Sequence, residues 1–294
     1  MQHRASFRWF LAAFLLTSPA ALGGILYVDA GLASGANDGS SWSDAFQGPH
    51  GLQAALAAVA AGDQVFVAQG TYLASATGAR GASFTLLDGV ELYGSFLGGE
   101  SSPAERPPFG TAPSVLSGDL NGDDGQGLIA ENSFQIVDGG GANASAVLDG
   151  FEVRGGNADG SGNNNRGAGI LCMGGSNATV RNVRFLGNRC TFGGGAGYIT
   201  ASTPSFTDCT FDDNDGGAFG GAFDIAGAGA VSFDRCLFAR NTADRAGALE
   251  VFATTGVSVS NSSFHANVAT GTSGGGAIWV GSAGAMTVSD CSIV

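Results

Sequence analysis

Residues 183–188 read VRFLGN, a pattern in which a Phe is followed three residues later by an Asn. The same pattern returns in CTFDDN (209–214), CLFARN (236–241) and SSFHAN (262–267). The four Phe residues follow one another at steps of 26, 27 and 26 residues. A fixed period of this length is typical of repeat proteins, in which each repeat forms one structural unit.

A second marker has nearly the same period. A Gly-Ala pair stands before an apolar stretch in each repeat, with its glycine at Gly167, Gly195, Gly221, Gly247 and Gly276. These glycines are 28, 26, 26 and 29 residues apart. Because two independent markers agree, we expect regular repeats from about residue 146 to the end of the chain.

Each repeat is expected to hold two short strands with alternating apolar residues and no helix between them. The position two residues before each Phe, or before Ile293 in the last repeat, is small and often Cys: Val183, Cys209, Cys236, Ser262 and Cys291. Alternation places this column and the Phe column on one face, and a bulge or bend must precede them. Units under thirty residues without a helix cannot form βαβ crossovers, so the repeats are predicted to be stacked coils with parallel strands.

The composition fits tight corners between such strands. The chain has 51 glycines among 294 residues, and Gly accepts a positive φ without steric cost. The four Asn residues of the pattern are predicted to form a structural ladder, with left-handed backbone at the corner and hydrogen bonds along the stack. The Cys column is predicted to be a stack of small buried side chains, and a Cys209–Cys236 disulfide is the alternative.

The first half matches the repeat more loosely. In residues 146–157, Leu148, Phe151 and Val153 take the places of the later apolar columns. Residues 24–88 are predicted to form a strand, a loop and a helix over 52–61 that caps the first coil, and the coils are expected to fill 89–294. The chain stops inside a predicted strand, which indicates a truncated end.

The first 23 residues are predicted to be a secretory signal peptide, with two early arginines, a short apolar core and small residues after it. An uncleaved anchor helix is the alternative, and no later stretch is apolar enough to cross a membrane. The formal net charge is −13 and the chain has no Lys. It therefore lacks a Schiff-base or P-loop lysine, and an acidic chain is a poor partner for nucleic acid.

These residues resemble a known group of proteins. GGAI at 275–278, together with the Phe-x-x-Asn pattern, is similar to the repeat of the polymorphic outer membrane proteins of chlamydiae. The segments GVELYGSF (89–96) and SAVLDGFEVRGGN (145–157) resemble secreted pectin-lyase-like proteins. The resemblance implies an all-β, single-stranded, right-handed parallel β-helix that is exported. It implies no single activity, since such proteins include adhesins, passenger domains and polysaccharide lyases.

One row of outward side chains is the main candidate site. On the strand after each Gly-Ala pair, alternation points Tyr198, Asp224, Glu250 and Trp279 away from the core, one above another. Aromatic rings stack on sugars and acids bind hydroxyl groups, so the row is a candidate ligand site. Asp224 and Glu250 would lie about 5 Å apart, near the separation of a retaining glycosidase pair. The alternative is a solvated face that carries two acids by chance.

Two further groups are weaker candidates. Asp208 and Arg235 are outward neighbours that could serve a lyase, or that form a surface ion pair. The segment GDLNGDDG (118–125) offers Asp119, Asn121 and Asp123 as Ca²⁺ ligands, although it lacks the Gly and Glu that an EF-hand loop requires. A plain acidic turn is the alternative.

The sequence therefore favours an exported β-helix protein that binds a glycan, a cell surface or another protein without catalysis. The alternatives are a polysaccharide lyase or glycosidase that acts on the outer face, and a passenger fragment of a larger surface protein.

Overall fold

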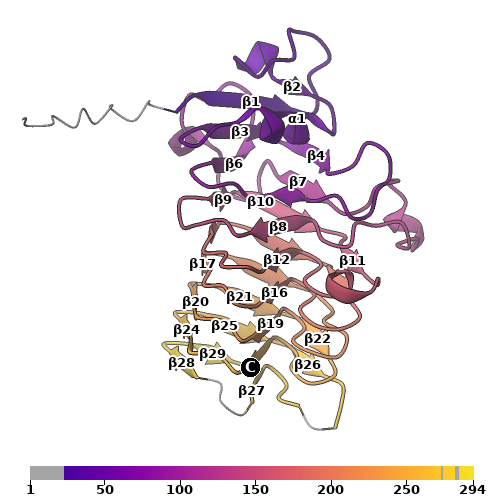
Figure 1. Cartoon of the computed structure of the whole chain (residues 1–294), viewed down its shortest axis with the longest axis vertical. Coiled ribbons are helices and arrows are strands. Elements are labelled where there is room, and N and C mark those ends of the chain that lie inside the picture. Colours follow the sequence, from indigo (N-terminus) through magenta and orange to yellow (C-terminus); the bar gives the residue numbers. More distant parts are fainter. Residues whose placement is uncertain (1–22, 273, 282–284) are drawn as a thin grey trace, which may run out of the picture.

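The computed structural model describes residues 23–272, 274–281 and 285–294, so nearly all of the predicted signal peptide lies outside it. Parallel strands of three long sheets stack along the molecule, from indigo strands at one end to yellow strands at the other (Figure 1). In each long sheet, a strand pairs with the equivalent strand of the next coil. The exception is the pair β1–β2 at the N-terminal end. The predicted stack of coils is therefore confirmed.

The strands of the three sheets have the following bounds. Sheet A holds β1 (Ile25–Asp29), β2 (Phe46–Gln47), β3 (Gln64–Ala68), β6 (Glu91–Phe96), β9 (Val147–Asp149), β13 (Thr179–Arg181), β17 (Ser205–Thr207), β20 (Ala230–Asp234), β24 (Gly256–Ser260) and β28 (Met286–Ser289). Sheet B holds β4 (Gly70–Leu73), β7 (Ser114–Ser117), β10 (Phe151–Arg154), β14 (Arg184–Leu186), β18 (Thr210–Asp212), β21 (Leu237–Ala239), β25 (Ser263–His265) and β29 (Ser292–Ile293). Sheet C holds β5 (Phe84–Thr85), β8 (Val137–Gly140), β12 (Ile170–Cys172), β16 (Gly197–Ile199), β19 (Phe223–Ala226), β23 (Leu249–Phe252) and β27 (Ile278–Val280).

Short elements fill the connections. Two small sheets pair β11 (Asn157–Ala158) with β15 (Arg189–Cys190), and β22 (Thr242–Ala243) with β26 (Val268–Ala269). Four 3-10 turns are η1 (Trp42–Asp44), η2 (Pro103–Glu105), η3 (Asp124–Gln126) and η4 (Gly162–Asn165).

Each coil has three main strands, so the prediction of two was wrong. The stretch before each Phe is split between sheets A and B by one residue with left-handed backbone. This residue, with φ between 50° and 54°, is Asn182, Asp208, Arg235, Asn261 or Asp290. The left-handed residue turns the chain through a corner, and it accounts for the bend that the sequence required. The register of the earlier coil is confirmed, because Leu148 pairs with Val180 and Val153 pairs with Phe185.

The helix α1 (Gly51–Ala58) covers the N-terminal end, where it contacts β1, β2, β4 and β5. It is shorter than the predicted 52–61, because the backbone is already extended at Val59. Leu52 and Ala55 are fully buried in the main core. The predicted cap is therefore present, and the described residues contain no helix long and apolar enough to span a membrane.

The core repeats the sequence pattern as stacked side chains. Ring centroids of Phe185 and Phe211 lie 5.4 Å apart, and those of Phe238 and Phe264 lie 4.5 Å apart. The cysteines are free thiols, and Cys209 and Cys236 are almost fully buried. The column is therefore a stack of small buried side chains, and the alternative disulfide is not formed.

The predicted Asn ladder is present, but its backbone differs from the expectation. Asn188 Nδ2 donates to Asn214 Oδ1 at 3.1 Å, and Asn214 Nδ2 donates to Asn241 Oδ1 at 2.9 Å. The left-handed residue is the one before each Asn, for example Asp213 with φ 56° and Arg240 with φ 52°. The Asn side chains thus satisfy buried groups along the stack, and the preceding residue makes the turn.

Candidate acid groove on sheet C

The predicted row of outward side chains is formed by four neighbouring strands. Tyr198 on β16 pairs with Asp224 on β19, Asp224 pairs with Glu250 on β23, and Glu250 pairs with Trp279 on β27. The parallel register therefore brings the predicted residues together in the expected order. Neighbouring strands lie about 4.8 Å apart, so the two acids are direct neighbours.

The row is not a solvated face. Tyr198 is 7% exposed, Asp224 is 5% exposed and Glu250 is 2% exposed, although all three point away from the main core. Carboxyl groups are rarely buried to this extent unless another group pairs with them. The alternative of two chance acids on open surface is therefore wrong.

A second row of side chains, contributed by the loops before sheet C, covers the acids. The Arg166 guanidinium carbon lies 4.5 Å from the Phe192 ring centroid and 4.8 Å from that of Tyr198. The Arg245 guanidinium carbon lies 4.5 Å from the centroid of Phe219 and 4.1 Å from that of Trp279. The rings of Phe192 and Phe219 are nearly perpendicular, with 5.0 Å between their centroids. Cation–π contacts thus hold both arginines against aromatic rings.

The sequence analysis missed this second row, although its period was visible. Arg166, Phe192, Phe219 and Arg245 stand at steps of 26, 27 and 26 residues, the same steps as the Phe-x-x-Asn pattern. They lie in Gly-rich loops, where no strand alternation assigns a direction to a side chain. The period places them in one column, but only the folded loops show that the column closes over the acids.

The two acids differ in their partners. Arg245 Nη2 donates to Glu250 Oε1, whereas Glu250 Oε2 is buried and accepts no hydrogen bond from the described residues. Burial, and after it the charge of Glu250, raise the pKa of Asp224, while Arg166 and Arg245 oppose the rise, and the net result is a pKa of about 7. Near neutral pH the pair therefore combines a Glu250 that is held by Arg245 with an Asp224 that readily gains or loses a proton.

A glycine makes room for the Asp224 carboxyl group. A Cβ atom at Gly193 would lie 2.3 Å from Asp224 Oδ2, which is far inside van der Waals contact. Gly193 forms bridges to Arg166 on one side and Phe219 on the other, within the covering row. The Gly-rich loop thus has a direct role in shaping the site, because a larger residue would displace the acid.

These side chains surround a hollow of about 400 Å³, which we name the acid groove. It is lined by Arg166, Phe192, Tyr198, Phe219, Asp224, Ala226, Arg245, Glu250 and Phe252. Phe192 is 38% exposed and Phe252 is 42% exposed, so two aromatic rings stand open at its edges. The groove therefore combines open apolar faces with hydrogen-bond acceptors at its floor.

The second candidate pair lies at a corner between sheets A and B. Arg235 Nε and Nη2 donate to the two carboxylate oxygens of Asp208, each at 2.8 Å, and both side chains are exposed. The hydrogen bonds to Asp208 raise the pKa of Arg235, which disfavours the neutral guanidine that a base requires. The geometry is that of the surface ion pair, and the lyase role remains a prediction.

The acidic turn brings a different set of residues together than the sequence analysis proposed. Carboxylate oxygens of Asp119, Asp123 and Glu131 lie within 4.8 Å of one another, and Asn121 is exposed outside this set. Asp119 Oδ1 accepts the backbone N–H groups of Gly122 at 2.6 Å and Asp123 at 3.1 Å. Asp119 thus stabilises the turn itself, and Ca²⁺ binding here remains a prediction.

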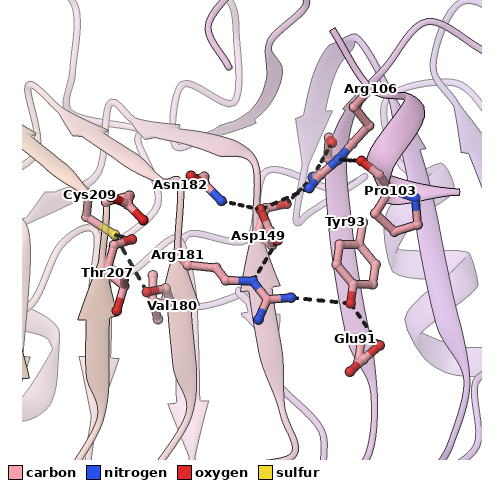
Figure 2. A network of polar contacts seen from close by, with 12 residues as sticks. Glu91, Tyr93, Pro103, Arg106, Asp149, Val180, Arg181, Asn182, Thr207 and Cys209 are labelled. Carbon is pink, nitrogen blue, oxygen red and sulfur yellow. Dashed lines mark hydrogen bonds and ion pairs between the residues drawn. The ribbon is translucent and has the colours of Figure 1, made fainter. Parts of the chain in front are cut away.

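Another buried acid is fully engaged in the structure (Figure 2). Asp149 accepts hydrogen bonds from Arg181 Nε at 2.7 Å, Asn182 Nδ2 at 3.0 Å and Arg106 Nη2 at 3.3 Å. Arg181 Nη2 also donates to the Tyr93 hydroxyl group at 3.4 Å. Since both oxygens of Asp149 have partners, this network ties the long loop that carries Arg106 to the coils.

Comparison with known proteins identifies the architecture. No curated protein and no solved structure matches the chain. The family described as "Right handed beta helix region" matches residues 128–293, which is more than half of the chain and includes the acid groove. The stacked parallel coils agree with that match, and the chain therefore belongs to the right-handed β-helix family.

Proposed function

We propose that this protein is exported and binds an extracellular glycan in the acid groove without cleaving it. The observation that carries the proposal is the pairing of two open aromatic rings, Phe192 and Phe252, with two buried carboxyl groups between them. Sugar rings present apolar C–H faces that pack on aromatic rings, and hydroxyl groups that donate to acids. The predicted signal peptide and the resemblance to outer membrane and secreted proteins support the location.

The shape of the groove supports an extended ligand. Phe192 belongs to the loop before β16 and Phe252 ends β23, so the exposed rings come from coils two steps apart along the stack. Two coil spacings amount to roughly 10 Å, about the length of two sugar units. A glycan chain that crosses the groove from the loop before β16 to the end of β23 can therefore contact both rings.

Glycoside hydrolysis is the second candidate, and the pKa of Asp224 favours it. An acid with a pKa of about 7 suits a proton donor, and a neighbouring carboxylate suits a nucleophile. However, Glu250 is 2% exposed and one of its oxygens is held by Arg245, so a sugar carbon has little access to it. Binding without cleavage therefore agrees better with the geometry.

A binding assay tests the proposal. The mature protein is applied to an immobilised panel of extracellular polysaccharides, next to the variants Phe252→Ala and Leu237→Ala. Leu237 is 37% exposed on sheet B, away from the groove, and so provides a matched loss of exposed apolar surface. We expect the unmodified protein to bind a polysaccharide of the panel. Binding should fall at least tenfold in Phe252→Ala, as for loss of one stacked aromatic ring. It should be unchanged in Leu237→Ala.

Two results would contradict the proposal. Equal loss of binding in both variants would show that the groove has no special role. Release of reducing-end or unsaturated products, abolished by Asp224→Asn, would replace binding with the enzymatic alternative.

A further inference from the structure

Two charged side chains in the acid groove lack a partner of opposite charge. Asp224 is 5% exposed and lines the groove, and no donor among the described residues forms a hydrogen bond with its carboxyl group. Carboxyl groups are rarely buried to this extent without a partner. Arg166 lines the same groove, and within the described part of the chain no carboxylate pairs with it. Arg166 Nε donates to Asn165 Oδ1 at 3.1 Å, which leaves the two Nη groups to a ligand.

Aromatic contacts keep Arg166 and Asp224 from pairing with each other. The Arg166 guanidinium carbon lies 4.5 Å from the ring centroid of Phe192 and 4.8 Å from that of Tyr198. The charge of Arg166 still opposes the rise in the pKa of Asp224, so the two groups are near each other without forming an ion pair. Since both line one hollow, a ligand in the groove can contact them together.

The other acid and the other arginine of the groove already satisfy each other. Arg245 Nη2 donates to Glu250 Oε1, and the two side chains form an ion pair. Glu250 is 2% exposed, so its second oxygen is out of reach of a ligand. Arg245 is more exposed, but Glu250 compensates its charge. A ligand in the groove therefore meets one unpaired negative group and one unpaired positive group.

Charge complementarity determines which ligand fits these two groups. A ligand with only a carboxylate would pair with Arg166 but bring a like charge beside Asp224. A ligand with only an amine would pair with Asp224 but meet the positive charges of Arg166 and Arg245. Like charges in a shared site disfavour each other's ionised form. A ligand that carries both groups pairs with each side chain and adds no net charge.

We propose, on the basis of the glycan-binding function assigned above, that the ligand is a zwitterionic glycan whose ammonium group pairs with Asp224 and whose carboxylate pairs with Arg166. An amino sugar with a free amine, linked to a uronic acid, has this chemistry. A guanidinium binds a carboxylate through two parallel hydrogen bonds, and an ammonium donates a charge-assisted hydrogen bond to a carboxylate. The exposed rings of Phe192 and Phe252 then pack on the sugar faces.

Calorimetry with four forms of one hexasaccharide tests the inference. The hyaluronan hexasaccharide is anionic, and removal of its N-acetyl groups makes it zwitterionic. Reduction of the carboxyl groups in these two forms gives a neutral and a cationic probe with the same linkages. At pH 7 we expect the zwitterionic form to bind at least tenfold more tightly than each of the others, as for the gain of one charge-assisted hydrogen bond.

Two variants assign the charges of the ligand to residues of the groove. In Arg166→Gln the gain from the carboxylate should disappear, so the zwitterionic and cationic forms should bind equally. In Asp224→Asn the gain from the free amine should disappear, so the zwitterionic and anionic forms should bind equally. Arg154→Gln is the control, because Arg154 is 48% exposed beside Glu152 on sheet B, and it should keep the full preference.

The outcomes separate the two proposals. If the neutral form binds as tightly as the zwitterionic form, and Phe252→Ala loses this binding, the zwitterionic ligand is wrong and the glycan groove stands. If Arg166→Gln and Asp224→Asn both keep the full preference, the assignment of charges to these residues is wrong. If no hexasaccharide binds, the zwitterionic ligand is wrong, and the polysaccharide panel decides separately on the glycan groove. Binding of free alanine, a zwitterion without a sugar ring, and of no glycan would overturn both proposals.

Discussion

The ion pair between Arg245 and Glu250 gives the most direct test of the electrostatics of the acid groove. In Arg245→Met, Glu250 keeps its buried position but loses the guanidinium that neutralises it. Breaking a buried ion pair by removing one partner typically lowers the free energy of unfolding by 3–5 kcal/mol. Because the Arg245 side chain is 32% exposed, water can replace part of the pairing, and we expect a loss of about 3 kcal/mol at pH 8.

The loss should depend on pH with a definite sign. Without Arg245, the buried charge of Glu250 has no compensating cation, and this uncompensated charge destabilises the folded state. Acid conditions, which neutralise carboxylates, remove the charge and with it the penalty. The penalty should therefore be largest at pH 8, smaller at pH 5 and nearly absent at pH 4.

Urea unfolding at these three pH values provides the measurement. The double variant Arg245→Met/Glu250→Gln also lacks the Arg245 stacking but removes the uncompensated charge, so it should recover most of the stability at pH 8. Arg154→Met is the control for an ordinary surface pair, because Arg154 is 48% exposed and contacts Glu152, and it should change stability by under about 1 kcal/mol. If Arg245→Met lowered the free energy of unfolding by less than about 1 kcal/mol at every pH, the reasoning would be refuted, because the folded state would not require Arg245 to neutralise Glu250.

Four other changes have defined outcomes. Asp224→Asn should become more stable relative to the unmodified protein as the pH rises from 4 to 7, by up to about 4 kcal/mol in urea unfolding, because burial raises the pKa of Asp224 from 3.8 to about 7. Glu250→Gln should lower the pKa of Asp224, measured by carbon NMR of the carboxyl groups, since a neighbouring negative charge is removed; an unchanged pKa would contradict their coupling. Asn214→Ala should lose about 2–6 kcal/mol, because it leaves two buried donors without an acceptor, whereas exposed Asn163→Ala should lose little. Gly193→Ala should weaken glycan binding at least tenfold in the panel assay, since its Cβ would displace the Asp224 carboxyl group; full binding would show that the acid's position is unimportant.

The backbone conformation of the corner residues could not be obtained from the sequence pattern. Alternation required a bend between the apolar columns, but many kinds of bend satisfy that requirement. Most residues that adopt the left-handed backbone there are Asn or Asp, which tolerate it well, but the equivalent residue Arg235 has no such preference. The stacking of identical corners imposes this conformation, and a single repeat considered alone does not reveal it.

The sequence by itself determined the period, the parallel stacking, the Phe and Asn columns and the order of Tyr198, Asp224, Glu250 and Trp279. All of these follow from local alternation and a fixed repeat length, which place equivalent residues one above another. The burial of the two acids was decided only by the tertiary structure. Arg166 and Arg245 reach the acids from Gly-rich loops, and the path of such loops depends on packing against neighbouring coils. The pKa of Asp224, and with it the proposed chemistry of the groove, therefore arises from contacts that sequence periodicity does not specify.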